Sequence, residues 1–142
     1  MPELAEVETT RRGIQSSVCD QLVTKMVIRQ YQLRWPIPDM VSEVLLGKIF
    51  TEVQRRGKYL LFRTDIGTLI VHLGMSGCLR IVKAKESARK HDHVDIHFQN
   101  GYCLRYTDPR RFGSILWTAD DPCEHKLLRD LGPEPLSAAF DA

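Results

Sequence analysis

The stretch VDIHFQNGYCLRY, residues 94–106, decides the fold class. In its first half, Val94, Ile96 and Phe98 alternate with polar residues, which is typical of a β-strand with one face in water. Asn100-Gly101 is a common two-residue hairpin turn, because both residue types tolerate a positive φ. Residues 102–106 then continue as a second strand. The stretch therefore predicts two antiparallel strands that pair with each other.

The same two-residue period extends over most of the chain after Gly47. Strands are expected at residues 22–29, 49–53, 59–63, 68–73, 78–82, 94–98, 102–106 and 114–117. Because short connections join them, the sequence predicts a mainly β fold with some α, a two-layered antiparallel β-sandwich.

Two helices are expected to flank this sandwich. Apolar residues follow helical spacing from residue 3 to residue 19, and Glu3, Glu6 and Glu8 fill the first turns, where a helix favours acidic side chains. Pro36 and Pro38 introduce a second, short helix at about residues 39–46. The fold class is thus a sandwich with an N-terminal helix and a second short helix outside it.

Composition excludes several classes of protein. The chain has 142 residues, of which 43% are hydrophobic and 27% charged, as in an ordinary globular domain. It contains no apolar run of about 20 residues that could span a bilayer, and no signal peptide is evident. The four cysteines form no Cys-x-x-C pair. We therefore expect a cytoplasmic monomer with reduced thiols and no membrane partner.

Charge is distributed unevenly along the chain. Residues 1–118 carry 18 Lys and Arg against 12 Asp and Glu, whereas residues 119–142 carry 2 against 6. Thirteen of the 20 cations are arginine, the side chain that pairs with phosphate and stacks on bases. This favours a nucleic-acid partner, although charge alone does not distinguish such a surface from an ordinary solvated one.

Pro2 is a candidate nucleophile. Removal of Met1 would leave a secondary amine, and an α-amino group titrates near about 8, so part of it is unprotonated at neutral pH. Attack by such an amine on an aldehyde-like carbon gives a charged iminium. Glu3 and Glu6 lie close enough in sequence to carry protons. Pro-Glu is also ordinary capping of a helix, and the small tautomerases use an N-terminal proline as a base, but there it begins a strand.

Residues 2–9, PELAEVET, closely resemble the N-terminal signature of the bacterial formamidopyrimidine-DNA glycosylases, which remove 8-oxoguanine and ring-opened purines. Further segments resemble motifs of that family in the same order: RRGKYL at 55–60, HLGMSG at 72–77, KHDHVD at 90–95 and TDPRRFG at 107–113. LGPEPL at 131–136 resembles the end of the family's first domain. The resemblance implies a catalytic domain at residues 1–130 and the start of an interdomain linker at 131–142.

Four catalytic residues are implied by this resemblance. Pro2 would displace the damaged base and form a Schiff base with the sugar, and Glu3 would be the proton donor and general acid/base. Glu6 would assist in the same pocket, and Lys58 would be the cation beside the strand break. Without the family, a lysine at a strand edge is an ordinary solvated side chain.

Five DNA-binding residues are implied as well. His72 resembles the family's phosphate contact and His91 a DNA-contacting residue, while Met75, Arg110 and Phe112 would fill the gap left by the flipped base and contact the orphaned base. Taken alone, a methionine such as Met75 is more often a filler of the apolar core, and residues 108–113 are a plausible structural turn.

Two further expectations concern metals and cofactors. His91 and His93 would share one face of a strand, but two imidazoles without a third ligand make a poor site, so no metal is expected. The family's helix–two-turns–helix module and zinc finger lie in a second half that would follow residue 142, so no cofactor is expected in this chain.

The sequence departs from the family in two ways, at residue 5 and in ending near the middle of a family member, and it leaves a choice of function. Ala5 stands where the family usually has proline, from which we expect a small effect. The expected partner is double-stranded DNA containing an oxidised purine or an abasic site, and the expected function is a glycosylase with abasic-site lyase activity. The alternative is a non-catalytic, truncated DNA-binding remnant. The endonuclease-eight-like relatives, which prefer pyrimidines, are less well matched at Met75, Arg110 and Phe112.

Overall fold

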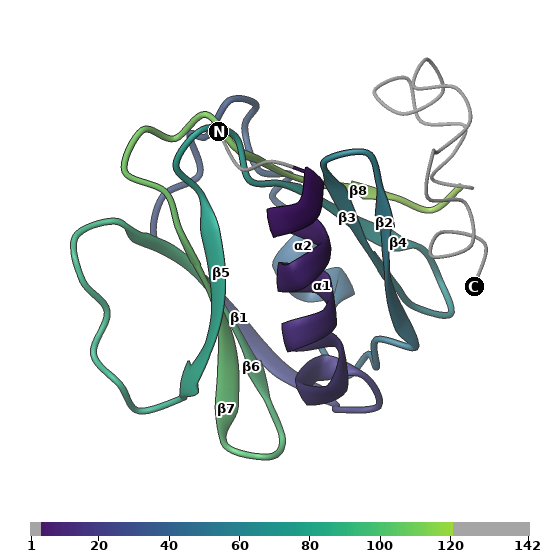
Figure 1. Cartoon of the computed structure of the whole chain (residues 1–142). Coiled ribbons are helices and arrows are strands. Elements are labelled where there is room, and N and C mark those ends of the chain that lie inside the picture. The colour runs from purple at the N-terminus through teal and green to yellow at the C-terminus, as the bar shows by residue number, and fades with distance from the viewer. Residues whose placement is uncertain (1–3, 121–142) are drawn as a thin grey trace.

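The computed structural model describes residues 4–120. Two four-stranded sheets form a sandwich, and every strand pair is antiparallel. The first sheet has the order β1 (Val23–Ile28), β6 (Asp92–Phe98), β7 (Tyr102–Thr107), β5 (Cys78–Lys83). The second has the order β2 (Glu52–Arg56), β3 (Tyr59–Arg63), β4 (Thr68–His72), β8 (Ser114–Thr118). Helices α1 (Leu4–Val18) and α2 (Val41–Val44) flank the sheets (Figure 1). The predicted fold class is confirmed.

The hairpin at residues 94–106 forms as predicted, with Ile96 opposite Leu104 across β6 and β7. The prediction that β6 has one face in water is wrong, because all seven of its residues are buried. Asp95 on the outer face pairs with Arg105, whose guanidinium also donates to the backbone oxygen of Glu86 at 2.8 Å. The connection between β5 and β6 therefore covers this face.

Two predicted elements differ in their bounds. A strand was expected at residues 49–53, but β2 begins only at Glu52, because Ile49 and Phe50 instead make isolated bridges to Leu22 and Cys19. Helix α2 is a single turn, shorter than the expected 39–46. The other strands lie within two residues of their predicted bounds.

The core joins the helix to both sheets. Val7, Ile14 and Val18 of α1 are buried, and the helix lies against β2, β3 and β5 (Figure 1). The Phe50 ring lies 5.3 Å from that of Phe62 and 6.1 Å from that of Phe98, centroid to centroid. Because Phe62 belongs to one sheet and Phe98 to the other, this aromatic cluster fastens the two layers together.

Two short loops cross from one sheet to the other at the same end of the sandwich. Residues 73–77 lead from β4 to β5, and residues 108–113 lead from β7 back to β8. The strand register explains why the loops meet, since His72 is opposite Ser114 and Cys78 is opposite Thr107. Each loop thus begins beside the place where the other ends.

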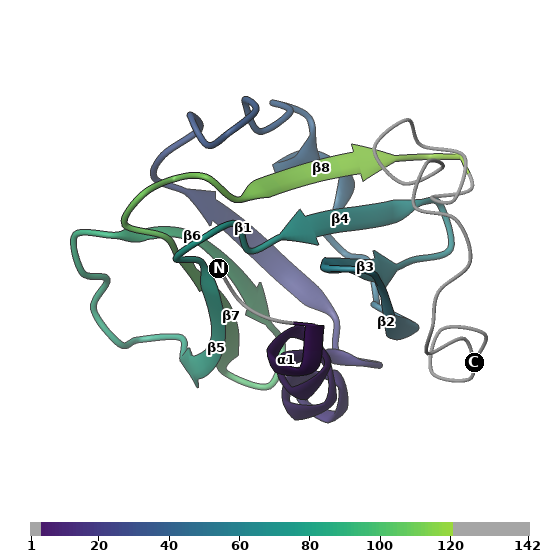
Figure 2. The ribbon, with the colours of Figure 1, turned by 45° about the horizontal axis from the view of Figure 1, so that its top comes forward.

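Two more connections reach this end. The β2–β3 turn at residues 57–58 adjoins it because Tyr59 is opposite His72. Residues 29–40, which follow β1, are tied to it by a hydrogen bond from the Arg34 amide to the Gly113 oxygen at 3.0 Å. We call these four segments the loop end. The first turn of α1 points toward it (Figures 1 and 2).

Within the part of the chain that the structure describes, no helix is long and apolar enough to cross a membrane. Cys19, Cys78 and Cys103 are unpaired thiols. Cys123, like the linker predicted at 131–142, lies outside the described residues.

Candidate functional site

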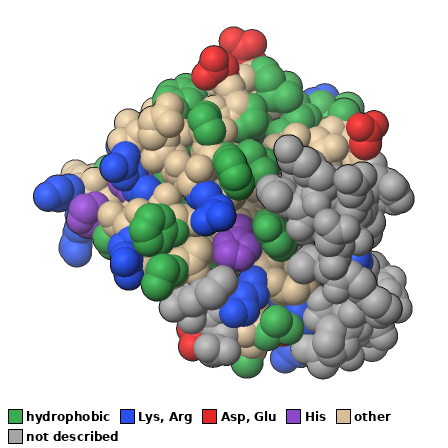
Figure 3. Space-filling model, turned by 90° about the horizontal axis from the view of Figure 1, so that it is seen from above, with side chains coloured by type: hydrophobic (Ala, Val, Ile, Leu, Met, Phe, Trp, Pro, Cys, Tyr) green, Lys and Arg blue, Asp and Glu red, His purple; other side chains and the backbone are tan. Residues whose placement is uncertain are grey.

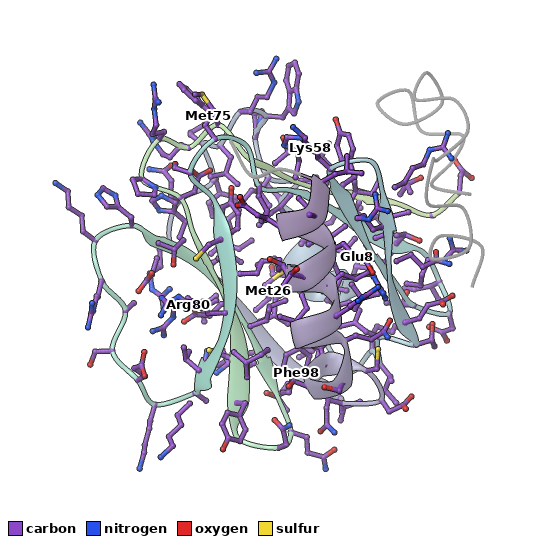
Figure 4. The ribbon with its side chains drawn as sticks, in the orientation of Figure 1. Glu8, Met26, Lys58, Met75, Arg80 and Phe98 are labelled. Atoms are coloured by element: carbon purple, nitrogen blue, oxygen red, sulfur yellow. The ribbon has the colours of Figure 1, made fainter. Side chains whose placement is uncertain are left out.

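The loop end brings together candidate residues that belong to four separate sequence motifs. Lys58 and Met75 lie at this end in Figure 4, and the view onto it shows basic side chains interspersed with apolar ones and a histidine (Figure 3). A pocket of about 510 Å³ opens here. It is lined by Arg34, Trp35, Tyr59, His72, Gly74, Met75, Phe112 and Ser114.

His72 is a neutral hydrogen-bond donor in this pocket. Its Nδ1 accepts a hydrogen bond from the Gly74 amide at 3.0 Å, which leaves Nε2 to carry the proton. Burial, and the positive charges of Lys58 and Arg34, lower the pKa of His72 below its usual value. The ring can therefore donate to a phosphate oxygen, while the positive charge comes from Lys58 and Arg34.

Met75 and Phe112 project from the two sheet-crossing loops into solvent, with 46% and 43% of their surface exposed. The interpretation of Met75 as a filler of the core is therefore wrong. The Arg110 guanidinium lies over the Phe112 ring, 5.1 Å from its centroid. Exposed apolar side chains with a cation beside them suit insertion into a base stack. We call Met75 and Phe112 the wedge.

His91 adjoins the loop end through its backbone, since its carbonyl oxygen accepts from the Asp108 amide at 3.1 Å. His93 is buried, and its Nε2 donates to the Asp108 carbonyl oxygen at 2.8 Å. One ring nitrogen of His93 is thus already engaged, which makes the His91–His93 pair an even poorer metal site.

A different group of described residues has metal-like spacing: Asp95, His97 and Cys103 offer ligand atoms within 4.8 Å of one another. Both Asp95 oxygens, however, accept hydrogen bonds from Arg105, and one also pairs with Arg29 at 2.6 Å. Two guanidinium cations beside the carboxylate disfavour a bound cation. The expectation that the chain holds no metal stays a prediction.

The predicted catalytic residues are placed only in part. Pro2 and Glu3 lie outside the described residues. Glu6 is exposed on the first turn of α1, and Lys58 is half-buried in the β2–β3 turn. The predicted roles of all four residues remain predictions.

Glu8 is a residue whose importance the sequence did not reveal. Glu8 is 7% exposed, and its carboxylate accepts from Arg11 at 2.7 Å, from Arg12 at 2.9 Å and from Arg55 at 3.1 Å. Hydrogen bonds from Arg11, followed by those from Arg12 and Arg55, outweigh burial and lower its pKa from 4.5 to about 2. Because Arg55 is on β2, Glu8 ties α1 to the strand that leads to Lys58 (Figure 4).

Arg34 and Trp35 were also missed. They line the same pocket as His72 and Met75, and the Arg34 guanidinium lies 5.4 Å from the Trp35 ring centroid. Their only signal in the sequence is an Arg-Trp-Pro run in a connection, which carries no specific chemistry.

Residues 1–115 match the family model of the formamidopyrimidine-DNA glycosylase N-terminal domain. The chain belongs to this family. Formamidopyrimidine-DNA glycosylases of Methylococcus capsulatus and Stutzerimonas stutzeri are each 57% identical to it over 141 residues, which are 99% of this chain and 52% of each relative. The chain thus spans about half the length of the curated relatives it matches.

Solved structures of the family share the fold. A complex between the LlFpg protein, a THF-DNA and an inhibitor has a TM-score of 0.79 and 32% identity, covering 84% of this chain and 45% of that one. The Lactococcus lactis glycosylase bound non-covalently to DNA containing an AP site has a TM-score of 0.77 and 31% identity, covering 83% and 45%. The predicted family and fold are confirmed.

Proposed function

We propose that the chain is the catalytic half of a base-excision repair glycosylase that removes oxidised purines, 8-oxoguanine and formamidopyrimidines, and cleaves DNA at abasic sites. Its partner would be double-stranded DNA containing such a lesion. One observation carries the proposal: the phosphate-binding residue types, Lys58 and His72, lie beside an exposed wedge, Met75 and Phe112, at one end of the sandwich. Membership of the glycosylase family supports it.

The proposed chemistry begins at Pro2. Its amine attacks C1′ of the damaged nucleotide, the bond from C1′ to the base breaks, and Glu3 supplies the proton that the departing base needs. The amine then loses its proton, O4′ gains one, and the sugar ring opens to an iminium. The iminium acidifies C2′, which loses a proton to a base, and the electrons of that C–H bond expel the 3′ phosphate. Glu6 assists proton transfer, and Lys58 holds the phosphate at the strand break.

Recognition would come from the loop end. His72 donates to a phosphate oxygen as a neutral ring, and Lys58 adds the charge. Met75, Phe112 and Arg110 enter the gap that a flipped base leaves, which offsets part of the lost stacking. His91 would contact the DNA backbone near the lesion.

The proposed organisation follows the family. Residues 1–130 would form the catalytic domain, and residues 131–142 would begin the linker to the part that the longer relatives have in addition. We propose no cofactor for residues 1–142. The second candidate function is a non-catalytic DNA-binding remnant, in which the basic and apolar side chains of the loop end bind DNA without chemistry at Pro2.

Borohydride trapping separates the two candidates. The chain is incubated with a duplex containing an abasic site or 8-oxoguanine, and mass spectrometry establishes first that Met1 is absent. A chain with extra residues before Pro2 is the matched control, since an internal proline nitrogen cannot form an iminium. Lys58→Ala is compared with Lys83→Ala, which alters an exposed lysine at the far end of β5.

We expect a covalent complex at Pro2 with the abasic duplex, lost in the extended control and weakened by Lys58→Ala alone. Trapping on 8-oxoguanine as well would show that residues 1–142 suffice for excision. If neither duplex is trapped by a chain that begins at Pro2, the catalytic proposal for these residues is wrong, and DNA binding without trapping would favour the remnant.

A further inference from the structure

Asp108 is a buried carboxylate at the base of the loop end, with 0% of its surface exposed. Its Oδ2 accepts hydrogen bonds from the Tyr106 hydroxyl at 2.5 Å and the Gly113 amide at 2.9 Å. Its Oδ1 accepts from the Ser76 hydroxyl at 2.7 Å and the Arg111 amide at 3.0 Å. All four partners are donors, so the site requires a group that only accepts.

Ser76 makes this a connection between two loops. It belongs to residues 73–77, one position after Met75, whereas Asp108 belongs to residues 108–113. While its hydroxyl donates to Asp108, its oxygen accepts from the Arg110 amide at 3.2 Å. The loop that carries Met75 is therefore bonded directly to the loop that carries Arg110.

The two backbones also touch. Gly74 has a φ of +65°, and a Cβ at that position would lie 2.6 Å from the Gly113 nitrogen and 2.6 Å from the Phe112 carbonyl carbon. Only glycine permits so close an approach. The loops are thus in contact on both sides of the wedge.

Arg111 adopts a conformation that needs support. Its φ is +57°, in the left-handed region that costs free energy for a residue with a side chain. The Asp108 carboxylate bonds the Arg111 amide. This unusual turn separates Arg110 from Phe112 and allows the guanidinium of the former to lie over the ring of the latter.

We propose that Asp108 and Ser76 are positioning residues that hold the two loops as one preformed unit, so that Met75, Arg110 and Phe112 enter the gap in a base stack together. This rests on the proposed function for the DNA ligand. Neither residue needs to touch DNA. Because the wedge is ordered before binding, its insertion costs less conformational entropy. The resulting gain in affinity applies only to duplexes in which a flipped or missing base leaves a gap in the base stack.

The first test uses the chain without DNA. Backbone ¹⁵N relaxation is measured for residues 73–77 and 109–113 in the unaltered chain, in Ser76→Ala and in Ser16→Ala, a control on the exposed end of α1. We expect order parameters of about 0.85 in both loops, falling below about 0.6 in both for Ser76→Ala alone. Ser76 is half-buried and alanine is smaller, so the fold is retained. Two flexible loops in the unaltered chain, or one loop loosened without the other, would overturn the inference.

The second test measures affinity for a duplex with a tetrahydrofuran abasic analogue and for the same duplex without damage. Ser76→Ala removes a hydrogen bond to a charged group. We therefore expect it to lower, by about tenfold, the ratio of affinity for the duplex with the abasic analogue to affinity for the undamaged duplex. Affinity for intact DNA stays the same. In a Met75→Ala background the same change has a smaller further effect, because Ser76 acts through the wedge and only Phe112 of the wedge remains.

An equal loss on both duplexes, or effects that add with Met75→Ala, would mean that Ser76 has only a structural role. If the unaltered chain does not prefer the duplex with the abasic analogue, the proposed DNA function of residues 1–142 is wrong, whatever the role of Ser76. The relaxation measurement still decides in that case whether the loops form one unit.

Discussion

Replacing Glu8 by glutamine removes the charge that Arg11 and Arg12 of α1 and Arg55 of β2 share, and keeps the side chain's shape. The pKa of Glu8 falls from 4.5 to about 2 on folding, and each pKa unit corresponds to about 1.4 kcal/mol. The ionised carboxylate therefore adds about 3 kcal/mol to the free energy of unfolding at pH 7. The unfolded chain binds the proton more tightly than the folded one, so this contribution is complete above about pH 5 and is lost as the pH falls through about 2.

Urea unfolding at pH 7, 4 and 2.5 measures this contribution as the difference between the unaltered chain and Glu8→Gln. We expect about 3 kcal/mol at pH 7 and little at pH 2.5. Glu43→Gln on the exposed side of α2 is the control and should follow the unaltered chain. If the difference between Glu8→Gln and the unaltered chain does not change with pH, Glu8 is not held as an ion, and the attachment of α1 to β2 has another source.

Three other changes give further expectations. Arg105→Ala should reduce the free energy of unfolding by about 3 to 5 kcal/mol in the same urea assay. The reason is that Asp95, which is 1% exposed, loses its main partner. The control is Arg80→Ala, at a half-exposed position on β5, which should reduce the free energy of unfolding much less. Lys58→Ala should lower by about 1 the slope of log affinity for duplex DNA against log salt concentration. His72→Ala should weaken binding at pH 7 without changing that slope, since its ring is neutral, and an equal change of slope in both variants would refute the assigned protonation state.

The sequence predicted most strands because turn residues such as Asn100-Gly101 separate them, although runs such as residues 69–71 of β4 are buried without alternation. Periodicity also predicted which residues of β6 share a face, but it could not tell whether that face is covered. Asp95 is polar and suggests water, yet it is buried because Arg105, ten residues later, neutralises it and binds the connection that covers the sheet. Burial of a charged residue depends on a partner that is adjacent only after folding.

The sequence identified the motifs of the candidate site but did not show that they lie close together in the fold. Lys58, His72 and Met75 were each identified through family resemblance, but their proximity follows from loops that cross between sheets and from strand register. Asp108 lay within a recognised motif and still went unnoticed, because its function depends on Ser76, which is 32 residues away. Arg34 likewise gains significance only beside His72.

Asp108 and Ser76 help to explain how Met75 and Phe112 of the wedge can remain exposed in the folded chain. Full burial of a Met or Phe side chain is worth about 1.5 to 3 kcal/mol, so two such side chains in solvent would ordinarily fold back onto the protein. Short loops fixed at both ends by four-stranded sheets leave little room for that collapse. The Asp108 carboxylate, which bonds Ser76, Arg111 and Gly113, fixes the remaining freedom. Loosening the loops should therefore let Met75 and Phe112 bury themselves, so that Ser76→Ala loses its preference for the duplex with the abasic analogue while losing little stability.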